Sequence, residues 1–269
     1  MAPVIITLLT DFGLKDNYTA SMKGVILGMS PHARMVDVSH LVPPQDIRSG
    51  AFLLGRVYRD FPPGTIHLAV VDPGVGTSRR GLAMKAGGYF FVGPDNGLFS
   101  WILRKEPVWS AHSLEDPAYW RRVVSRTFHG RDIFAPVAAH LANGVDVAAF
   151  GPACSPILAR WSSPEAGENE LAGEVVYVDH FGNAITNLTR EALDLFAPSD
   201  QWAVTVAGRS IARAAEAYGD EAPGSVMALI GSDDHLEIAV NRGDAAGSLG
   251  VRTGSPVSVH RRHLSSASS

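Results

Sequence analysis

The first half of the chain alternates between two hydrophobic patterns. Residues 4–10 (VIITLLT) form a continuous apolar run, which is typical of a strand buried on both faces of a sheet. Residues 18–30 instead carry apolar side chains at helical spacing and stop before Pro31. The same patterns predict strands at 33–39 and 65–72, a hairpin of two short strands within 81–97, and helices at 45–61 and 131–144. This alternation favours an α/β domain with a mostly parallel sheet over residues 1–160.

The second half of the chain has a different pattern. Residues 161–170 are polar and lack periodicity, and we interpret them as a linker. Short strand-like segments separated by turn residues follow at 172–179, 183–188, 201–208, 225–231, 235–241 and 256–262. This spacing predicts a small all-β barrel domain, assigned to residues 171–263. The remaining residues, 264–269, are expected to form a disordered tail.

Composition and charge narrow the classes of function. The 269 residues are 46% hydrophobic and 19% charged, as in an ordinary folded protein, and the net charge is −4. Because no Lys/Arg tract occurs, binding to nucleic acid is disfavoured. The single cysteine excludes an intrachain disulfide, and the ten histidines lack the spacing of a zinc site, so no metal is expected. The apolar N-terminus has the pattern of a strand and no run is long enough to span a bilayer, so we expect a cytoplasmic protein without a membrane partner.

Acidic side chains follow two of the predicted strands. Asp11 and Asp16 come after the first strand, and Asp72 ends the third. Ligands of α/β sheets bind beyond the carboxyl ends of the strands, although a single acid there often only caps a helix or closes a turn. The stretch VVDPGVGTSRR, residues 70–80, is rich in glycine but lacks the phosphate-loop pattern, and its carboxylate would repel phosphate. We therefore expect a neutral or cationic ligand near Asp72.

Two basic side chains could complete a site with Asp72. Arg79 follows the glycine-rich turn, and His129 lies in RTFHGRD just before a predicted helix. Together they could orient and polarise a water molecule, with Arg79 fixing the carboxylate. The alternative interpretation is structural, with Asp132 capping the helix and His129 only packing. Arg80 is expected to be a solvated surface charge.

The start of the second domain offers groups that suit a heterocycle. In YVDHFGNAITN, Phe181 could stack on a ring while Asn183 and Asp179 form hydrogen bonds. Asn241 lies in a second loop, which also contains glycine. A hairpin turn and a simple loop are the alternative interpretations of these two segments.

Five separated motifs together are similar to one protein family. They are LLTDFGLKDNYTASMKGVI, VVDPGVGTSRR, VGPDNGLF, TFHGRDIFAPVAAHLA and GEVVYVDHFGNAITNL, in this order along the chain. The sequence resembles the S-adenosyl-L-methionine (SAM) hydroxide adenosyltransferases, which are related to the SAM-dependent fluorinase and chlorinase. The resemblance extends over nearly the whole chain, residues 4–262.

The resemblance implies hydrolysis of SAM to adenosine and L-methionine, with no metal and no further cofactor. It also implies an N-terminal α/β domain, a C-terminal β-barrel, and a homotrimer with active sites between subunits. The residues that match the family's catalytic set are Asp72, Arg79 and His129. The positions that match its substrate contacts are Asp11 at the ribose diol, Asp16 and Asp179 near the methionine ammonium, Phe181 and Asn183 on the adenine side, and more loosely Asn241 and Ala245.

Three other functions stay open at the level of sequence. A SAM-dependent halogenase would use the same substrate, but the resemblance places a tyrosine in the halogenases where this chain has Asp72. A non-catalytic SAM or adenosine sensor would bind its ligand without turnover. A metal phosphoesterase would need metal ligands, for which the sequence shows no pattern.

Overall fold

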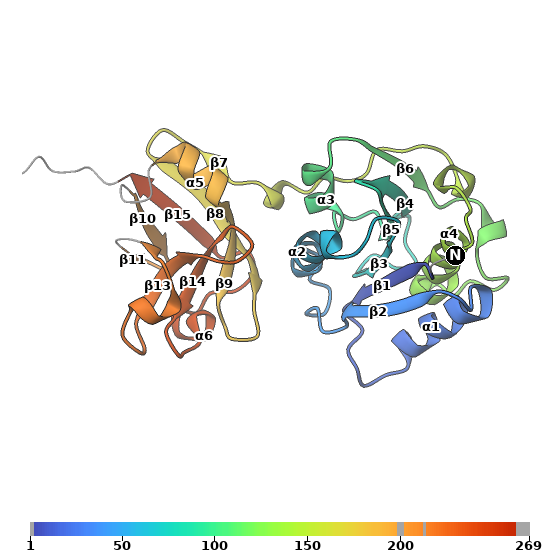
Figure 1. Ribbon diagram of the computed structural model, residues 1–269, viewed down its shortest axis with the longest axis horizontal. Helices are drawn as coiled ribbons and strands as arrows, with labels where there is room; N and C mark the ends of the chain where they lie inside the picture. Colours follow the sequence, from blue (N-terminus) through green and yellow to red (C-terminus); the bar gives the residue numbers. More distant parts are fainter. Residues whose placement is uncertain (1–2, 198–201, 212–213, 262–269) are drawn as a thin grey trace, which may run out of the picture. The chain divides into compact units, whose positions relative to one another are not determined.

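The chain folds into two compact units, Met1–Ala159 and Arg160–Ser269 (Figure 1). The computed structural model describes residues 3–197, 202–211 and 214–261. The predicted tail, 264–269, lies outside the described residues. Each unit has its own hydrophobic core. The two-domain organisation predicted from the sequence is therefore confirmed.

Unit 1 is built on a six-stranded sheet. Its strands are β1 Ile5–Thr10, β2 Arg34–Ser39, β3 Ile66–Val70, β4 Gly81–Ala86, β5 Tyr89–Pro94 and β6 Trp109–Ser113, in the order β2-β1-β3-β5-β4-β6. The first four strands in this order run parallel, whereas β4 is antiparallel to both β5 and β6. The sheet is therefore mixed, and the prediction of a mostly parallel sheet holds only for β2, β1, β3 and β5.

The antiparallel edge of this sheet follows from the short connection between β4 and β5. Gly87 and Gly88 have φ angles of +57° and +87°, the left-handed region that a two-residue hairpin turn requires. Two residues cannot cross the sheet, so the strands they join must be antiparallel. The sequence predicted this hairpin, but it did not predict β6, which pairs with the other side of β4.

Helices cover both faces of this sheet (Figure 1). They are α1 Tyr18–Met29, α2 Ile47–Val57, α3 Ser100–Lys105 and α4 Ala135–Ala142, with a π-helical turn at Gly130–Phe134 leading into α4. α1 and α4 share a core with Ile6 and Leu68, whereas Tyr58, just after α2, contacts His67 on the opposite face. Because both faces are covered, β3 is buried along its whole length. None of the helices in the described residues is long and apolar enough to cross a membrane.

Unit 2 is a nine-stranded, almost entirely antiparallel sheet that approaches a barrel. Its strands are β7 Glu165–Ala166, β8 Glu170–Val178, β9 Ala184–Thr189, β10 Trp202–Val206, β11 Arg209–Ile211, β12 Ala214–Ala215, β13 Val226–Ile230, β14 His235–Val240 and β15 Pro256–Arg261. The strand order is β11-β10-β15-β8-β9-β14-β13-β12, with β7 beside β8. The register of β8 shifts between Val175 and Tyr177, a bulge that helps the sheet to curve.

Several short elements of the chain were not predicted. β7 lies within the range interpreted as a linker. Two helices, α5 Arg190–Phe196 and α6 Ala245–Leu249, interrupt the strands of unit 2, and 3-10 turns lie at Tyr58–Asp60, Pro117–Tyr119, Val147–Phe150, Arg160–Ser162 and Tyr218–Asp220. Both helices begin at a side-chain cap, since the Thr189 hydroxyl accepts from Ala192 N and the Asp244 carboxylate from Gly247 N. Elements this short show no hydrophobic period, so pattern alone could not find them.

His67 is a titratable side chain in the core of unit 1. It is fully buried on β3, where its Nδ1 lies 2.8 Å from the Thr7 hydroxyl oxygen. Its ring stacks on Phe91 with 5.2 Å between the ring centroids. Burial disfavours the charged imidazolium and lowers the pKa of His67 to about 4. His67 is therefore neutral in the folded protein near neutral pH.

We expect His67 to make the free energy of unfolding fall in acid. Its folded pKa of about 4 lies below the ordinary value of 6.5, so between these two values the unfolded chain binds a proton that the folded chain does not. The loss is at most about 1.4 kcal/mol per pH unit. Urea unfolding of the wild type and of His67→Gln, which keeps a polar partner for Thr7 but does not titrate, measures this contribution. The free energy of unfolding should fall less steeply in acid for the variant than for the wild type. An equal fall in the two proteins would contradict the account.

Candidate active site

A cavity of about 390 Å³ opens at the carboxyl ends of β1 and β3. Asp11 and Phe12 line it after β1, Asp72 lines it after β3, and Phe128 and His129 line it just before the π-helical turn. This edge of the sheet is where α/β folds bind ligands. The fold thus brings three of the candidate residues, far apart in the sequence, to one cavity.

Arg79 joins Asp72 to His129 at the wall of this cavity. Its Nε donates to Asp72 Oδ1 at 2.8 Å, and its Nη2 donates to the other carboxylate oxygen. The same Nη2 lies 3.1 Å from His129 Nδ1. The Asp72 and Arg79 side chains are only 5% and 12% exposed, and the guanidinium packs over the ring of Phe134. Water competes little for these contacts, so the three groups are held in one arrangement.

The glycine-rich turn between Asp72 and Arg79 determines this geometry. Gly76 has a φ angle of +75°, in the left-handed region that other residues rarely adopt. A Cβ atom at Gly76 would lie 2.2 Å from the carbonyl oxygen of Arg126, so only glycine fits against the segment that leads to His129. The turn therefore folds back toward Asp72 and also packs on the loop that carries the histidine.

The contact with Arg79 determines which nitrogen of His129 carries the proton. A guanidinium can only donate, so Nδ1 must accept, and a neutral His129 must carry its proton on Nε2. Burial and the positive charge of Arg79 both lower the pKa of His129, and together they outweigh the opposing effects of the Asp72 and Asp132 charges. His129 is consequently a neutral imidazole whose Nε2–H is the group able to donate to a ligand oxygen.

Asp11 is the second carboxylate on the cavity wall. Its Oδ2 accepts a hydrogen bond from the backbone N–H of Gln45 at 2.8 Å. Burial raises the pKa of Asp11, the bond from Gln45 opposes this effect, and the nearby Asp72 adds to it. The preceding residue, Thr10, is held by buried His40, whose Nδ1 lies 2.9 Å from the threonine hydroxyl oxygen. Asp11 is therefore held at two points: Gln45 binds its carboxylate, and His40 binds the side chain of the preceding residue, Thr10.

Three aromatic rings form the apolar part of this site. Phe12, Tyr18 and Phe128 all line the cavity, and their ring centroids lie 5.1 to 5.9 Å apart in tilted and edge-to-face pairs. Such rings can contact a planar heterocycle or a cation. The cavity thus combines two carboxylates, a histidine and an aromatic wall, and Arg79 contacts two of its lining residues, Asp72 and His129.

Unit 2 has a cavity of its own, about 640 Å³ in volume. Asp179, Phe181 and Asn183 line it, together with Arg242 and Asp244. Asp179 accepts from the backbone N–H of Phe181 and of Asn183 and from the Asn183 amide at 2.8 to 2.9 Å. These bonds hold a tight turn from which the Phe181 ring projects with 73% of its surface exposed. The three residues named from the sequence therefore lie together.

Besides Arg79, three candidate residues do not line either cavity. Asp16 is exposed, in the loop before α1. Asn241 donates its side-chain amide to the carbonyl oxygen of Glu221 at 2.6 Å, and Ala245 is fully buried at the start of α6. Sequence reasoning missed Gln45 as a lining residue, because its contribution is a backbone N–H that carries no side-chain signal.

Arg80 is exposed, as expected from the sequence, but it is not an unpaired surface charge. Its Nε and Nη2 donate to Asp95 Oδ2 at 3.1 and 2.6 Å, and Asp95 is almost completely buried. Nη2 also donates to the carbonyl oxygen of Ser155, while Asp95 Oδ1 accepts from the backbone N–H of Ile157. Arg80 therefore anchors the last segment of unit 1. Its partner lies across the β4–β5 hairpin, which is why local spacing did not reveal it.

Among the residues that the structure describes, no three side chains of His, Cys, Asp or Glu are grouped so as to hold a metal ion.

Comparison with known proteins gives a consistent result. The N-terminal and C-terminal domain models of the SAM hydroxide adenosyltransferases match residues 6–151 and 173–258. The chain is 41% identical to the (R)-S-adenosyl-L-methionine hydrolase of Thermus thermophilus, over 96% of this chain and 99% of that protein. A crystal structure of an uncharacterized conserved protein from Thermotoga maritima matches it with a TM-score of 0.86 and 38% identity, covering 95% of this chain and 100% of that one. A fluorinase from Nocardia brasiliensis is more distant, at 28% identity over 71% of this chain and 73% of that protein. The chain therefore belongs to the SAM hydroxide adenosyltransferase family.

Proposed function

We propose that this protein hydrolyses SAM to adenosine and L-methionine by attack of a bound water or hydroxide on C5′ of the ribose. The observation that carries the proposal is that Asp72 and His129 line the cavity and are joined to each other by Arg79. Membership of the family and the 41% identity to a SAM hydrolase support the same reaction. The protein is thus an enzyme, and SAM is its substrate and not a cofactor.

The charges of the cavity suit a sulfonium substrate. SAM carries its positive charge on the sulfur bonded to C5′, next to the atom that is attacked. Asp11 places a carboxylate on the cavity wall, and the charges of Asp72 and Arg79 offset each other through their ion pair, so the net charge of these three groups is negative. Opposite charges attract more strongly where water is excluded, so an anionic nucleophile and a cationic substrate both gain from the buried setting.

The nucleophile is held by hydrogen-bond donors in this mechanism. Neutral His129 donates from Nε2 to the oxygen of water or hydroxide, because Arg79 occupies its Nδ1. Donation favours the anionic form of the oxygen, so the triad stabilises hydroxide and orients it toward C5′. His129 does not act as the base while this arrangement holds.

The leaving group requires no acid. The new bond joins the water oxygen to C5′, and the bond from C5′ to sulfur breaks with its electron pair going to sulfur. Methionine therefore leaves as a neutral thioether, and one proton is released from the water. The site therefore needs only to hold the attacking oxygen, C5′ of the ribose and the sulfonium sulfur in line.

Other residues are proposed to bind the rest of the substrate. Asp11 can accept hydrogen bonds from both hydroxyls of the ribose diol, which fits its place on the cavity wall. Phe181 and Asn183 are proposed to contact the adenine, and Asp179 to support them through its turn. Asp16, Asn241 and Ala245 remain proposed contacts on the resemblance alone.

The configuration of SAM at its sulfur atom allows the proposed activity to be stated more specifically. The Thermus thermophilus relative is named for the (R) form of SAM. We extend that preference to this protein. An enzyme that hydrolyses only the (R) epimer leaves the (S) epimer of SAM intact. The (S) epimer therefore stays available as a methyl donor while the enzyme is active.

Halogenation is supported less well than hydrolysis. The fluorinase of Nocardia brasiliensis is a more distant relative, at 28% identity, whereas the SAM hydrolase of Thermus thermophilus is 41% identical over almost the whole of both chains. This chain also carries Asp72 where the resemblance places a tyrosine in the halogenases.

The assembly and location of the protein are also matters of proposal. We propose a homotrimer with active sites between subunits on the family resemblance, and a cytoplasmic location on the strand-like pattern of the N-terminal residues. The residues proposed for the triad lie on unit 1 and those proposed for the adenine on unit 2. Native mass spectrometry of the purified protein tests the trimer directly.

The function is tested by incubating the protein with each sulfur epimer of SAM. We expect adenosine and methionine in equal amounts from (R)-SAM, and little product from (S)-SAM, with and without chloride. A 5′-chloroadenosine product would instead identify a halogenase. Tight binding of nucleoside without turnover would identify a sensor, and loss of activity with a chelator would identify a metal enzyme.

Two substitutions should separate chemistry from binding. His129→Ala removes the donor to the nucleophile, so we expect kcat to fall by about 10²-fold or more with little change in adenosine affinity.

Asp11→Ala removes the acceptor for the ribose diol, so it should mainly weaken adenosine binding. Steady-state kinetics and calorimetric titration with adenosine measure the two effects. An unchanged kcat in the first variant, or unchanged adenosine affinity in the second, would reject the assigned role.

A further inference from the structure

The segment before the π-helical turn carries His129 into the cavity without regular secondary structure of its own. Between the 3-10 turn at Pro117–Tyr119 and the π-helical turn it has no helix or strand. Thr127, Phe128 and His129 at its end all line the cavity. Something other than a helix or strand must therefore hold this segment in place.

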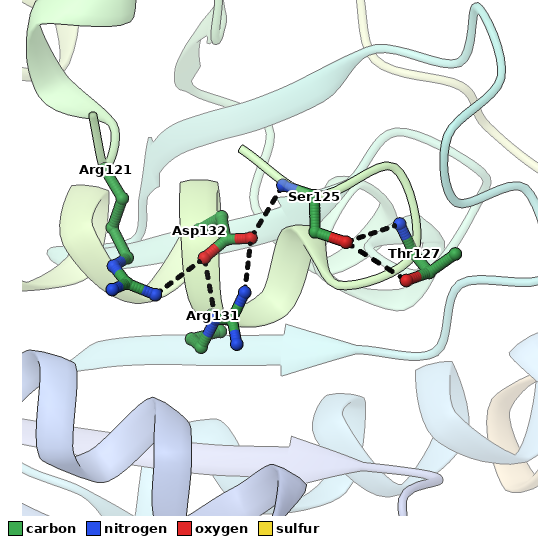
Figure 2. Close-up of polar contacts among 5 residues, drawn as sticks. All are labelled: Arg121, Ser125, Thr127, Arg131 and Asp132. Carbon is green, nitrogen blue, oxygen red and sulfur yellow. Dashed lines mark hydrogen bonds and ion pairs between the residues drawn. The ribbon is translucent and has the colours of Figure 1, made fainter. Parts of the chain in front are cut away.

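Asp132 is the residue to which this segment is tied. Its side chain is fully buried, yet all of its acceptor capacity is used (Figure 2). Oδ1 accepts from Arg121 Nη1 at 3.0 Å and from Arg131 Nε at 2.7 Å. Oδ2 accepts from Arg131 Nη2 and from the backbone N–H of Ser125, both at 2.9 Å. A carboxylate with four donors is fully satisfied, so the arrangement is well defined.

Backbone contacts of the same residue close the segment into a loop. The carbonyl oxygen of Asp132 accepts from Arg121 N at 2.9 Å, and Asp132 N donates to the carbonyl oxygen of Phe128 at 3.1 Å. The backbone of Asp132 is therefore bonded both to Arg121, near the start of the segment, and to Phe128, near its end. His129 lies within this closed loop.

The network continues from Asp132 to the cavity wall. The Ser125 hydroxyl accepts from the backbone N–H of Thr127 at 3.2 Å, and the two hydroxyl oxygens are 3.1 Å apart (Figure 2). Arg131 in turn packs its guanidinium over the Phe128 ring. Asp132 is thus connected to both residues that precede His129, through Ser125 on one side and Arg131 on the other.

The charge of Asp132 is as firmly held as its position. Burial alone would raise the pKa of this carboxyl group, but the hydrogen bonds from Arg131 and Ser125 outweigh burial and keep the pKa below its ordinary value. The carboxylate also balances two arginines close to a cavity proposed to take a cation. Asp132 does not cap the helix, as the alternative interpretation expected, because among the described residues its carboxylate accepts only from Arg121, Arg131 and Ser125.

We infer that Asp132 is a positioning residue for the reaction: through Ser125 and Arg131 it holds the His129 loop so that Nδ1 stays on Arg79 and Nε2–H faces the nucleophile. This inference rests on the proposed function, and it adds a role that neither the catalytic set nor the substrate contacts include. Asp132 itself does not line the cavity, so it acts through the groups it fixes and through its charge, which opposes the lowering of the His129 pKa. Supporting contacts of this kind decide whether a reacting group is held closely enough to work.

The test compares Asp132→Asn with a variant that loses stability elsewhere in unit 1. In Asp132→Asn we expect kcat for SAM to fall on the order of ten-fold or more, because a displaced His129 no longer holds the nucleophile. Adenosine affinity should stay within about two-fold, because the ribose site at Asp11 is untouched. Val137→Ala, in the buried part of α4, lowers stability without touching the loop and should leave kcat nearly unchanged.

A spectroscopic readout separates positioning from general stability. In ligand-free protein with ¹⁵N-labelled histidine, the wild-type His129 signal, assigned by its absence in His129→Ala, should show one tautomer with the proton on Nε2. Asp132→Asn should show a mixture of tautomers, whereas Val137→Ala should retain the single one. This measurement needs no substrate, so it stays informative even if the protein does not hydrolyse SAM.

The outcomes of this test are distinct. A folded Asp132→Asn protein with wild-type kcat and a single His129 tautomer would overturn the inference. If that variant does not fold, Ser125→Ala replaces it, because it removes only the hydroxyl link to Thr127 and leaves the backbone bond to Asp132. It should lower kcat and broaden the tautomer distribution in the same direction but by less, and no change in either would also overturn the inference.

Discussion

The ion pair between Asp72 and Arg79 is the interaction on which the rest of the site depends. The planar guanidinium of Arg79 uses two N–H groups on the carboxylate and still has one directed at His129 Nδ1. That single contact determines the tautomer of the histidine, and the tautomer determines which atom can reach a nucleophile. A buried ion pair contributes little to stability on its own account, since desolvation offsets the attraction. Its retention in this site is better explained by the orientation that it imposes.

Two pieces of local backbone make that ion pair possible. The turn after β3 brings Arg79 back to Asp72, and Gly76 allows it to pack on the loop that precedes His129. That loop is closed on itself by Asp132. The turn and the loop therefore support each other, one from each side of the triad. Such mutual support is how a group can be held on irregular backbone as firmly as on a helix or strand.

The sequence predicted the parts of this structure that depend on local pattern. Apolar runs identified β1 and β3, the paired glycines identified the β4–β5 hairpin, and acids at strand ends identified the cavity that Asp11 and Asp72 line. Features that depend on distant partners could not be found in this way. The pairing of Arg80 with Asp95 needs the register of a hairpin, and the contribution of Gln45 is a backbone N–H. The position of Asp16 outside both cavities likewise depends on how an exposed loop folds.

The central claim is that water attacks C5′ of the ribose and that the triad serves this step. Its most direct test is turnover of SAM in water enriched in ¹⁸O, followed by mass spectrometry of both products. The account predicts one ¹⁸O atom in the 5′-hydroxyl group of adenosine and none in methionine. An unlabelled adenosine, or label in homoserine released together with 5′-methylthioadenosine, would show that attack occurs elsewhere and would contradict the account.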